Sequence, residues 1–198
     1  MTRRYSLFLS LIIIFFEHSV QARTQTTLDY ESRIHPEIAD DFMVVSQNKH
    51  ATEAGYEILK KGGNAIDASV AVGFALAVTL PRAGNLGGGG FILIYDKDQD
   101  EVSSIDYRSA APKSATSDLF LNGDQVVRFG HLVNAVPGSV AGLLKAHEDY
   151  GTLPLSELLK PAIRLAKDGF EVTYDLNFVL EWGKESMLAN PSSKNKFY

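Results

Sequence analysis

The chain has no cysteine among its 198 residues, so it can form no disulfide, no thiolate metal site and no cysteine nucleophile. It also lacks an excess of positive charge. The formal net charge is −5 at pH 7 and no basic stripe is visible, which argues against a nucleic-acid partner. The hydrophobic content of 45% and the charged content of 22% are ordinary for a globular protein, and the length allows one sizeable core.

No apolar run is long enough to cross a bilayer, and this decides how the amino terminus is interpreted. Arg3 and Arg4 precede an apolar run over residues 7–16, and residues 20–22 (VQA) fit a cleavage site with small residues at −3 and −1. The alternative is a membrane anchor, which would need ~20 apolar residues. We therefore predict that residues 1–22 are a signal peptide and that the protein is periplasmic or secreted.

The rest of the chain is predicted to contain a mobile lead-in over residues 23–37 and one domain over residues 38–198. Asn48 and Thr173 are expected N-caps, and glycines at 62–63, 151 and 169 are expected helix ends. Capping residues, apolar periodicity and turn residues together predict four strands and five helices. The strands are expected over 42–47, 91–95, 102–107 and 125–129, and the helices over 49–61, 65–78, 137–150, 161–169 and from 174.

The helix over residues 65–78 is the centre of this pattern. Asn64 is a suitable N-cap, and Asp67 three residues later completes a capping box. Asp67 is therefore interpreted as a helix-start residue in preference to a catalytic acid. Apart from Asp67 and Ser69 the segment is apolar on every side, so we expect the helix to be enclosed on most of its surface.

Four consecutive glycines, residues 87–90, follow this helix and allow two interpretations. They could form a turn where helix and sheet pack closely, since glycine lets another backbone approach. They could instead present backbone N–H groups to an anion. A nucleotide-binding loop is not expected, because Phe91 and Ile92 stand where a phosphate-binding loop needs Lys and Ser or Thr.

No metal site is expected. The acidic turn over residues 96–101 resembles a calcium loop only superficially, because Glu101 stands at its sixth position and Tyr107 at its twelfth. We interpret it as a solvated hairpin turn. The histidines at positions 18, 35, 50, 131 and 147 show no ligand spacing, and His18 belongs to the predicted signal peptide.

Five motifs, in order along the chain, resemble those of the γ-glutamyltranspeptidases, also called glutathione hydrolases. They are residues 62–68 (GGNAIDA), 83–91 (AGNLGGGGF), 106–112 (DYRSAAP), 136–142 (VPGSVAG) and 161–170 (PAIRLAKDGF). The resemblance covers the chain from about residue 34 onward, and corresponds to the front part of the family's large subunit. It implies an α/β (α+β) fold, a partial four-layer αββα sandwich of the N-terminal-nucleophile hydrolase type.

The resemblance also implies a role for Arg108. The family's corresponding arginine holds the α-carboxylate of the γ-glutamyl group, and a guanidinium is a rigid fork of donors that matches a carboxylate. Asp106 is a weaker candidate for steadying Arg108, since residues at i and i+2 of a strand share a face. No cofactor or metal is implied.

By the same resemblance, no catalytic nucleophile lies in these 198 residues. In the family a precursor cleaves itself, and the threonine that then starts the small subunit attacks the substrate. Signal cleavage would expose Arg23, which cannot attack an acyl carbon, and Thr26 and Thr27 lack the family's flanking residues. The chain ends at Tyr198 just after helical patterning, which we interpret as an interruption.

We therefore expect a γ-glutamyltransferase or glutathione hydrolase of glutathione catabolism, present as a fragment that is inactive alone. Its expected partners are γ-glutamyl compounds, water or amino-acid acceptors, and the small subunit. Two alternatives stay open: a non-catalytic module that binds γ-glutamyl compounds or amino acids, and the remnant of an interrupted gene.

Overall fold

A computed structural model describes residues 38–119, 121–122, 125–126, 133–189 and 191–197. The chain divides into two compact units, Met1–Asp40 and Asp41–Tyr198. The predicted signal peptide and lead-in lie outside the described residues. All the helices and strands that the structure describes belong to the second unit.

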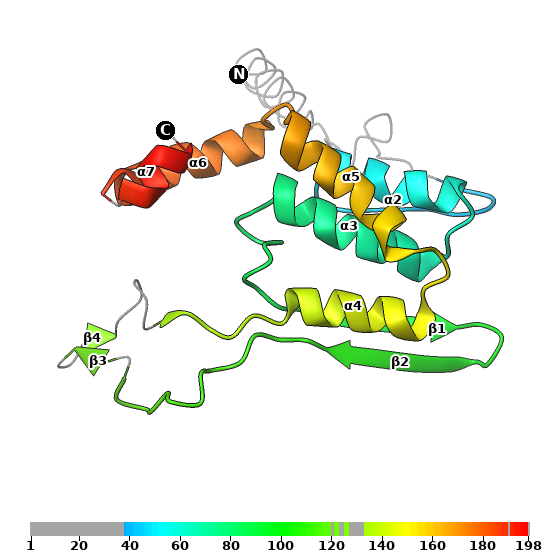
Figure 1. Cartoon of the computed structure of the whole chain (residues 1–198), viewed down its shortest axis with the longest axis horizontal. Helices are drawn as coiled ribbons and strands as arrows, with labels where there is room; N and C mark the ends of the chain where they lie inside the picture. Colours follow the sequence, from blue (N-terminus) through cyan, green and yellow to red (C-terminus); the bar gives the residue numbers. More distant parts are fainter. Residues whose placement is uncertain (1–37, 120, 123–124, 127–132, 190, 198) are drawn as a thin grey trace, which may run out of the picture. The chain divides into compact units, whose positions relative to one another are not determined.

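Helices and a hairpin make up most of this unit (Figure 1). In chain order the elements are α2 (Lys49–Lys60), α3 (Ala65–Thr79), β1 (Phe91–Asp96), β2 (Glu101–Asp106), β3 (Leu121–Asn122), β4 (Gln125–Val126), α4 (Ser139–Tyr150), α5 (Leu155–Asp168), α6 (Tyr174–Leu188) and α7 (Pro191–Phe197). Of the strand predicted over 125–129, only β4 lies within the described residues.

The helix starts predicted at Asn48, Asn64 and Thr173 are confirmed by the capping contacts. The side chain of Asn48 accepts hydrogen bonds from the backbone N–H groups of His50 and Ala51, and that of Thr173 accepts one from Leu176. Asn64 and Asp67 form the predicted capping box. Gly62 and Gly169 follow α2 and α5 with φ of 87° and 81°, a conformation in which glycine carries no penalty.

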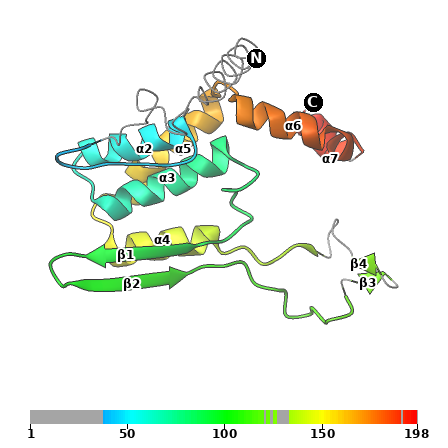
Figure 2. The ribbon, with the colours of Figure 1, turned by 180° about the vertical axis from the view of Figure 1, so that it is seen from behind.

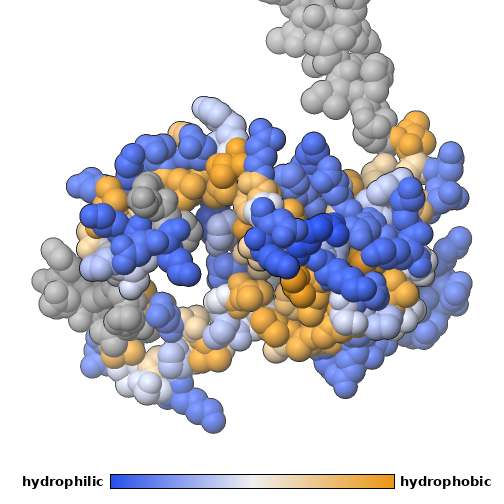
Figure 3. Space-filling view, turned by 45° about the horizontal axis from the view of Figure 1, so that its top comes forward, coloured by the Kyte–Doolittle hydropathy of each residue, from blue (hydrophilic) through white to orange (hydrophobic). Residues whose placement is uncertain are grey.

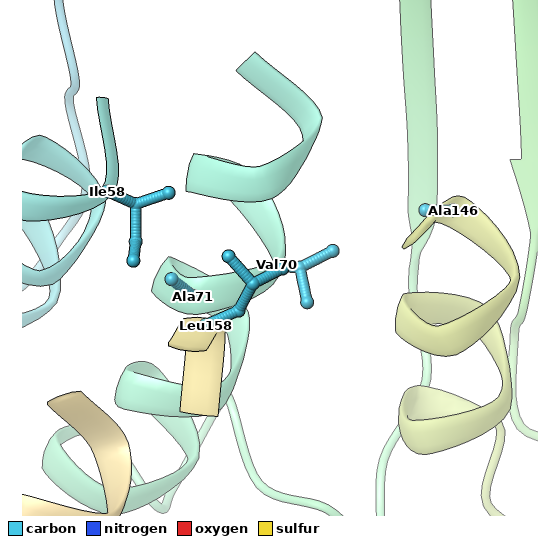
Figure 4. Close-up of a cluster of buried hydrophobic side chains, with 5 residues drawn as sticks. All are labelled: Ile58, Val70, Ala71, Ala146 and Leu158. Carbon is cyan, nitrogen blue, oxygen red and sulfur yellow. The ribbon is translucent and has the colours of Figure 1, made fainter. Parts of the chain in front are cut away.

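Helix α3 lies at the centre of the unit, with α2 and α5 on one side and α4 with the β1–β2 hairpin on the other (Figures 1 and 2). Side chains from α2, α3 and α5 meet in the core, and Ala146 of α4 joins them from the other side (Figure 4). The cluster consists of Ile58, Val70, Ala71, Ala146 and Leu158, all fully buried. Ile92 and Ile105 of the hairpin pack against it.

The expected enclosure of α3 is only partly realised. Val70, Ala71 and Ala75 are fully buried. A different side of the helix, which includes Val72 and Leu76, lines a cavity of about 750 Å³ instead. Elsewhere, other apolar residues are exposed, and Figure 3 shows apolar residues at the surface among polar ones.

The β1–β2 hairpin matches its prediction. The strands pair antiparallel, with Phe91 opposite Asp106 and Asp96 opposite Glu101. The carboxylate of Asp96 accepts from the N–H groups of Asp98 and Gln99, and the turn is exposed as expected. One face of the hairpin meets the core, and the other leaves Leu93 77% exposed.

Three sequence predictions are wrong. Residues 42–47 form no strand, because no described segment pairs with them. Helix α4 begins at Ser139 instead of at Pro137, with Gly138 as its N-cap. The helix predicted to begin at Pro161 begins earlier, at Leu155, so that Pro161 lies inside the continuous helix α5. The proline ring is fully buried. We infer that its packing in the core compensates for the helix hydrogen bond that proline, which has no backbone N–H, cannot donate.

Candidate functional site

Arg108 lies two residues beyond the end of β2, and its side chain is exposed. Its backbone N–H donates a 2.9 Å hydrogen bond to Oδ1 of Asp106. Asp106 thus holds the main chain of Arg108, and no described hydrogen bond joins it to the guanidinium. Among the described residues none forms an ion pair with this guanidinium, which leaves its fork of donors available for a ligand.

Backbone pairing fixes the chain on each side of Arg108. On the near side, the N–H of Tyr107 donates to the carbonyl of Gly90 at 3.0 Å, and the return bond is 3.4 Å long. On the far side, Ala110 and Val136 exchange backbone hydrogen bonds of 3.1 and 2.8 Å. The arginine is therefore carried on a short segment that is anchored at both ends.

The glycine run packs directly against this segment. A Cβ on Gly89 would lie 2.3 Å from the backbone nitrogen of Ser109, and one on Gly90 would lie 2.8 Å from the hydroxyl of Tyr107. The interpretation of these glycines as a close-packed turn is confirmed. The N–H groups of Gly88 and Gly90 donate to protein carbonyls, so these two are not free to bind an anion.

The start of α4 contacts the same segment. A Cβ on Gly138 would lie 2.0 Å from the carbonyl oxygen of Tyr107, and one on Gly142 would lie 2.1 Å from Cγ of its ring. The N–H groups of Gly138 and Ser139 donate to the carbonyl of Gly88 at 2.8 and 3.1 Å. The two glycine motifs therefore both contact Tyr107. The tyrosine side chain is half-buried, and this burial raises the pKa of its hydroxyl.

Sequence reasoning singled out Arg108 but missed Tyr107, Gly138 and Gly142 as its neighbours. The signal was present, because all three belong to motifs that carry the family resemblance. What the sequence did not indicate was that residues 89–90, 107–109 and 138–142 come together.

Asp67 has a structural role, as predicted. It is fully buried, and its carboxylate accepts hydrogen bonds from the N–H groups of Asn64, Thr152 and Leu153 and from the Thr152 hydroxyl. Burial by itself raises the pKa of Asp67, but these hydrogen bonds outweigh it and leave the pKa below its ordinary value. The carboxylate joins the start of α3 to the α4–α5 loop.

The remaining candidates show no catalytic arrangement. His50 packs edge-on against Phe170, and Nε2 of His147 contacts the carbonyl of Leu153 at 2.7 Å. His18, His35 and His131 lie outside the described residues. Within the described ranges, no three His, Asp or Glu side chains are grouped as a metal site would need, and no helix combines the length and apolarity of a membrane span.

The sequence of this chain matches a known enzyme family over most of its length. The family model described as gamma-glutamyltranspeptidase matches residues 51–198. The glutathione hydrolase proenzyme of Escherichia coli (strain K12) is 47% identical over 174 residues, which cover 85% of this chain and 30% of that protein.

Solved structures of the same family superpose on the fold. The crystal structure of Helicobacter pylori γ-glutamyltranspeptidase gives a TM-score of 0.77 at 40% identity, covering 81% of this chain and 47% of that one. The γ-glutamyltranspeptidase of Pseudomonas nitroreducens complexed with L-DON gives 0.70 at 40% identity, covering 81% and 48%. The chain therefore belongs to the γ-glutamyltranspeptidase family.

This membership confirms the predicted fold class. The unit is α/β, and the solved relatives that it superposes on are enzymes of the N-terminal-nucleophile hydrolase type. The chain spans 30% of the length of the E. coli proenzyme and just under half of each solved chain.

Proposed function

We propose that this chain is the front part of the large subunit of a γ-glutamyltransferase or glutathione hydrolase. The complete protein would cleave the γ-glutamyl amide of glutathione and pass the γ-glutamyl group to water or to an amino acid. Membership of the family supports the reaction class. The apolar segment over 7–16 with its expected cleavage site supports export to the periplasm or beyond the cell.

Within this reaction we propose that Arg108 binds the α-carboxylate of the γ-glutamyl donor. The single observation that carries the proposal is an exposed guanidinium on a backbone anchored at both ends, with no acidic partner among the described residues. A rigidly based arginine can meet a carboxylate with two parallel N–H···O bonds. That contact would orient the donor so that its γ-carbonyl faces the nucleophile.

The nucleophile itself is proposed to come from the small subunit, whose residues are not among these 198. Its threonine hydroxyl would attack the γ-carbonyl while the α-amino group of the same threonine takes the hydroxyl proton; the amide bond then breaks, the amine leaves with that proton, and a γ-glutamyl ester remains. Water or an amino acid would then attack the ester. In this scheme the chain contributes substrate binding and the support for it, and the partner subunit contributes the covalent chemistry.

The role of Arg108 is testable in a hybrid proenzyme, in which residues 51–198 of this chain replace the matching part of the E. coli glutathione hydrolase proenzyme. Arg108→Lys keeps the charge but removes the fork of donors. Losing one charge-assisted hydrogen bond raises KM for a γ-glutamyl anilide by about 10- to 100-fold. The effect on kcat is expected to be smaller, because the α-carboxylate is bound in the ground state as well.

Arg164→Lys is the matched control. Arg164 is also exposed, but it pairs with Glu57 between α5 and α2, at 2.9 Å. We expect its KM to equal that of the parent hybrid. An Arg108→Lys hybrid that matures normally and keeps the parent KM would refute the proposed carboxylate contact.

A further inference from the structure

The position of Tyr107, directly before Arg108, is set by two segments about fifty residues apart in the chain. Gly89 approaches from the loop before β1, and Gly138 and Gly142 approach from the start of α4. We call these three residues the glycine clamp. The two segments are tied to each other, because the carbonyl of Gly88 accepts hydrogen bonds from the start of α4.

The glycine clamp leaves no room for a side chain next to the peptides that flank Arg108. A Cβ on Gly138 would lie 2.0 Å from the carbonyl oxygen of Tyr107, and one on Gly89 would lie 2.9 Å from the carbonyl carbon of Arg108. The backbone of Gly138 has φ of −110°, which any residue adopts. Glycine is therefore required there for close approach and not for conformation.

The ring of Tyr107 adds a third contact. Gly142 lies in the first turns of α4 with its backbone against this ring, so that an added Cβ would lie 2.1 to 2.4 Å from three of the tyrosine's atoms. Backbone and ring of Tyr107 are both held, and the next residue along is Arg108. A displacement of Tyr107 is thus passed to the arginine through one peptide plane.

We propose that Tyr107 and the glycine clamp are positioning residues that aim the guanidinium of Arg108, and that they thereby set the enzyme's selectivity for donors with a free α-carboxylate. This inference rests on the proposed function of Arg108. Arginine has a long side chain with high rotamer entropy. The direction of its Cα–Cβ bond therefore decides whether the guanidinium can form a bidentate contact with the carboxylate. A misplacement of about 1 Å at a binding group can cost about 100-fold in rate.

The test uses the hybrid proenzyme and two donors, γ-glutamyl p-nitroanilide and the same compound with its α-carboxylate converted to an amide. The measured quantity is the ratio of their kcat/KM values. In Gly142→Ala the added methyl meets the Tyr107 ring, and we expect the ratio in favour of the free acid to fall by about tenfold or more. The loss should appear in KM for the free acid, with kcat/KM for the amide little changed.

Gly183→Ala makes the same chemical change in the helix α6, where the nearest side-chain atom to the new Cβ is 3.9 Å away. Its ratio is expected to equal that of the parent. Tyr107→Leu removes the ring without adding a clash, and should lower the ratio as Gly142→Ala does. If Gly142→Ala prevents maturation of the hybrid proenzyme, Tyr107→Leu alone tests the positioning role.

An Arg108→Gln background separates the positioning role from the proposed function of Arg108 itself. If Gly142→Ala and Tyr107→Leu each lower the preference for the free acid by themselves, but add no further change once Arg108→Gln has abolished it, the positioning role is supported. If Arg108→Gln abolishes the preference while Gly142→Ala and Tyr107→Leu alone leave it intact, the positioning inference is overturned. If Arg108→Gln itself leaves the preference intact, the proposed function of Arg108 fails.

Discussion

At the scale of single residues, Asp67 shows how one buried carboxylate connects distant parts of the chain. Replacing Asp67 with asparagine puts a neutral amide where the carboxylate accepts hydrogen bonds from three backbone N–H groups and one hydroxyl. We expect Asp67→Asn to lower the free energy of unfolding by about 2–3 kcal/mol, measured by urea unfolding at neutral pH. The exposed turn residue Asp98 provides the control, and Asp98→Asn should change that free energy by less than about 0.5 kcal/mol.

The same residue predicts an acid dependence. Its pKa is lower in the folded chain than in the unfolded one, so its stabilising contribution is complete above the unfolded value of about 3.9. The contribution is lost as the pH falls through the lower, folded pKa. Melting temperatures recorded between about pH 6 and about pH 2 should therefore fall more steeply for the parent than for Asp67→Asn. Parallel curves would contradict this role of the carboxylate.

At the scale of elements, the β1–β2 hairpin presents an uncovered apolar face. Phe91, Leu93 and Tyr95 of β1 and Val102 of β2 are each between 61% and 77% exposed, and both strands have a free edge among the described residues. Such a surface favours association with other chains. We predict that the isolated chain self-associates as its concentration rises, and that Leu93→Lys shifts the chain toward monomer in sedimentation experiments.

The control for this prediction is another exposed apolar residue in a different element. Ile163 of α5 is 58% exposed, and Ile163→Lys adds the same charge away from the hairpin. It should leave the association unchanged. A parent chain that stays monomeric over the whole concentration range would show that the exposed hairpin face does not drive self-association.

At the scale of the whole molecule, the isolated chain is expected to have no catalytic activity. We proposed above that the threonine nucleophile comes from the small subunit and not from these 198 residues. We predict that the purified 198-residue chain releases no p-nitroaniline from γ-glutamyl p-nitroanilide above the buffer rate, while the hybrid proenzyme does. Release by the chain alone would mean that a nucleophile within it has been overlooked.

Calorimetry with glutamate separates the binding-module alternative from the proposed function at the same scale. One arginine supplies a single charge-assisted contact, which is too little to hold a small ligand against the cost of immobilising it. The isolated chain should therefore give no measurable heat. A clear binding isotherm would favour the module.

The amino-acid sequence by itself determined the local structure around the site. The caps at Asn48, Asn64 and Thr173, the helix end at Gly62 and the β1–β2 hairpin were all predicted, because each depends on contacts between residues a few positions apart. The motif around Arg108 could be identified for the same reason, as an uninterrupted run of residues.

Only the tertiary structure decided what surrounds that motif. Residues 42–47 are not a strand, because pairing needs a second strand and none of the described segments provides it. Pro161 stays within α5, where its buried ring packs in the core. Gly89 and Gly138 approach Tyr107 from 18 and 31 positions away in the chain, and only packing brings such residues together.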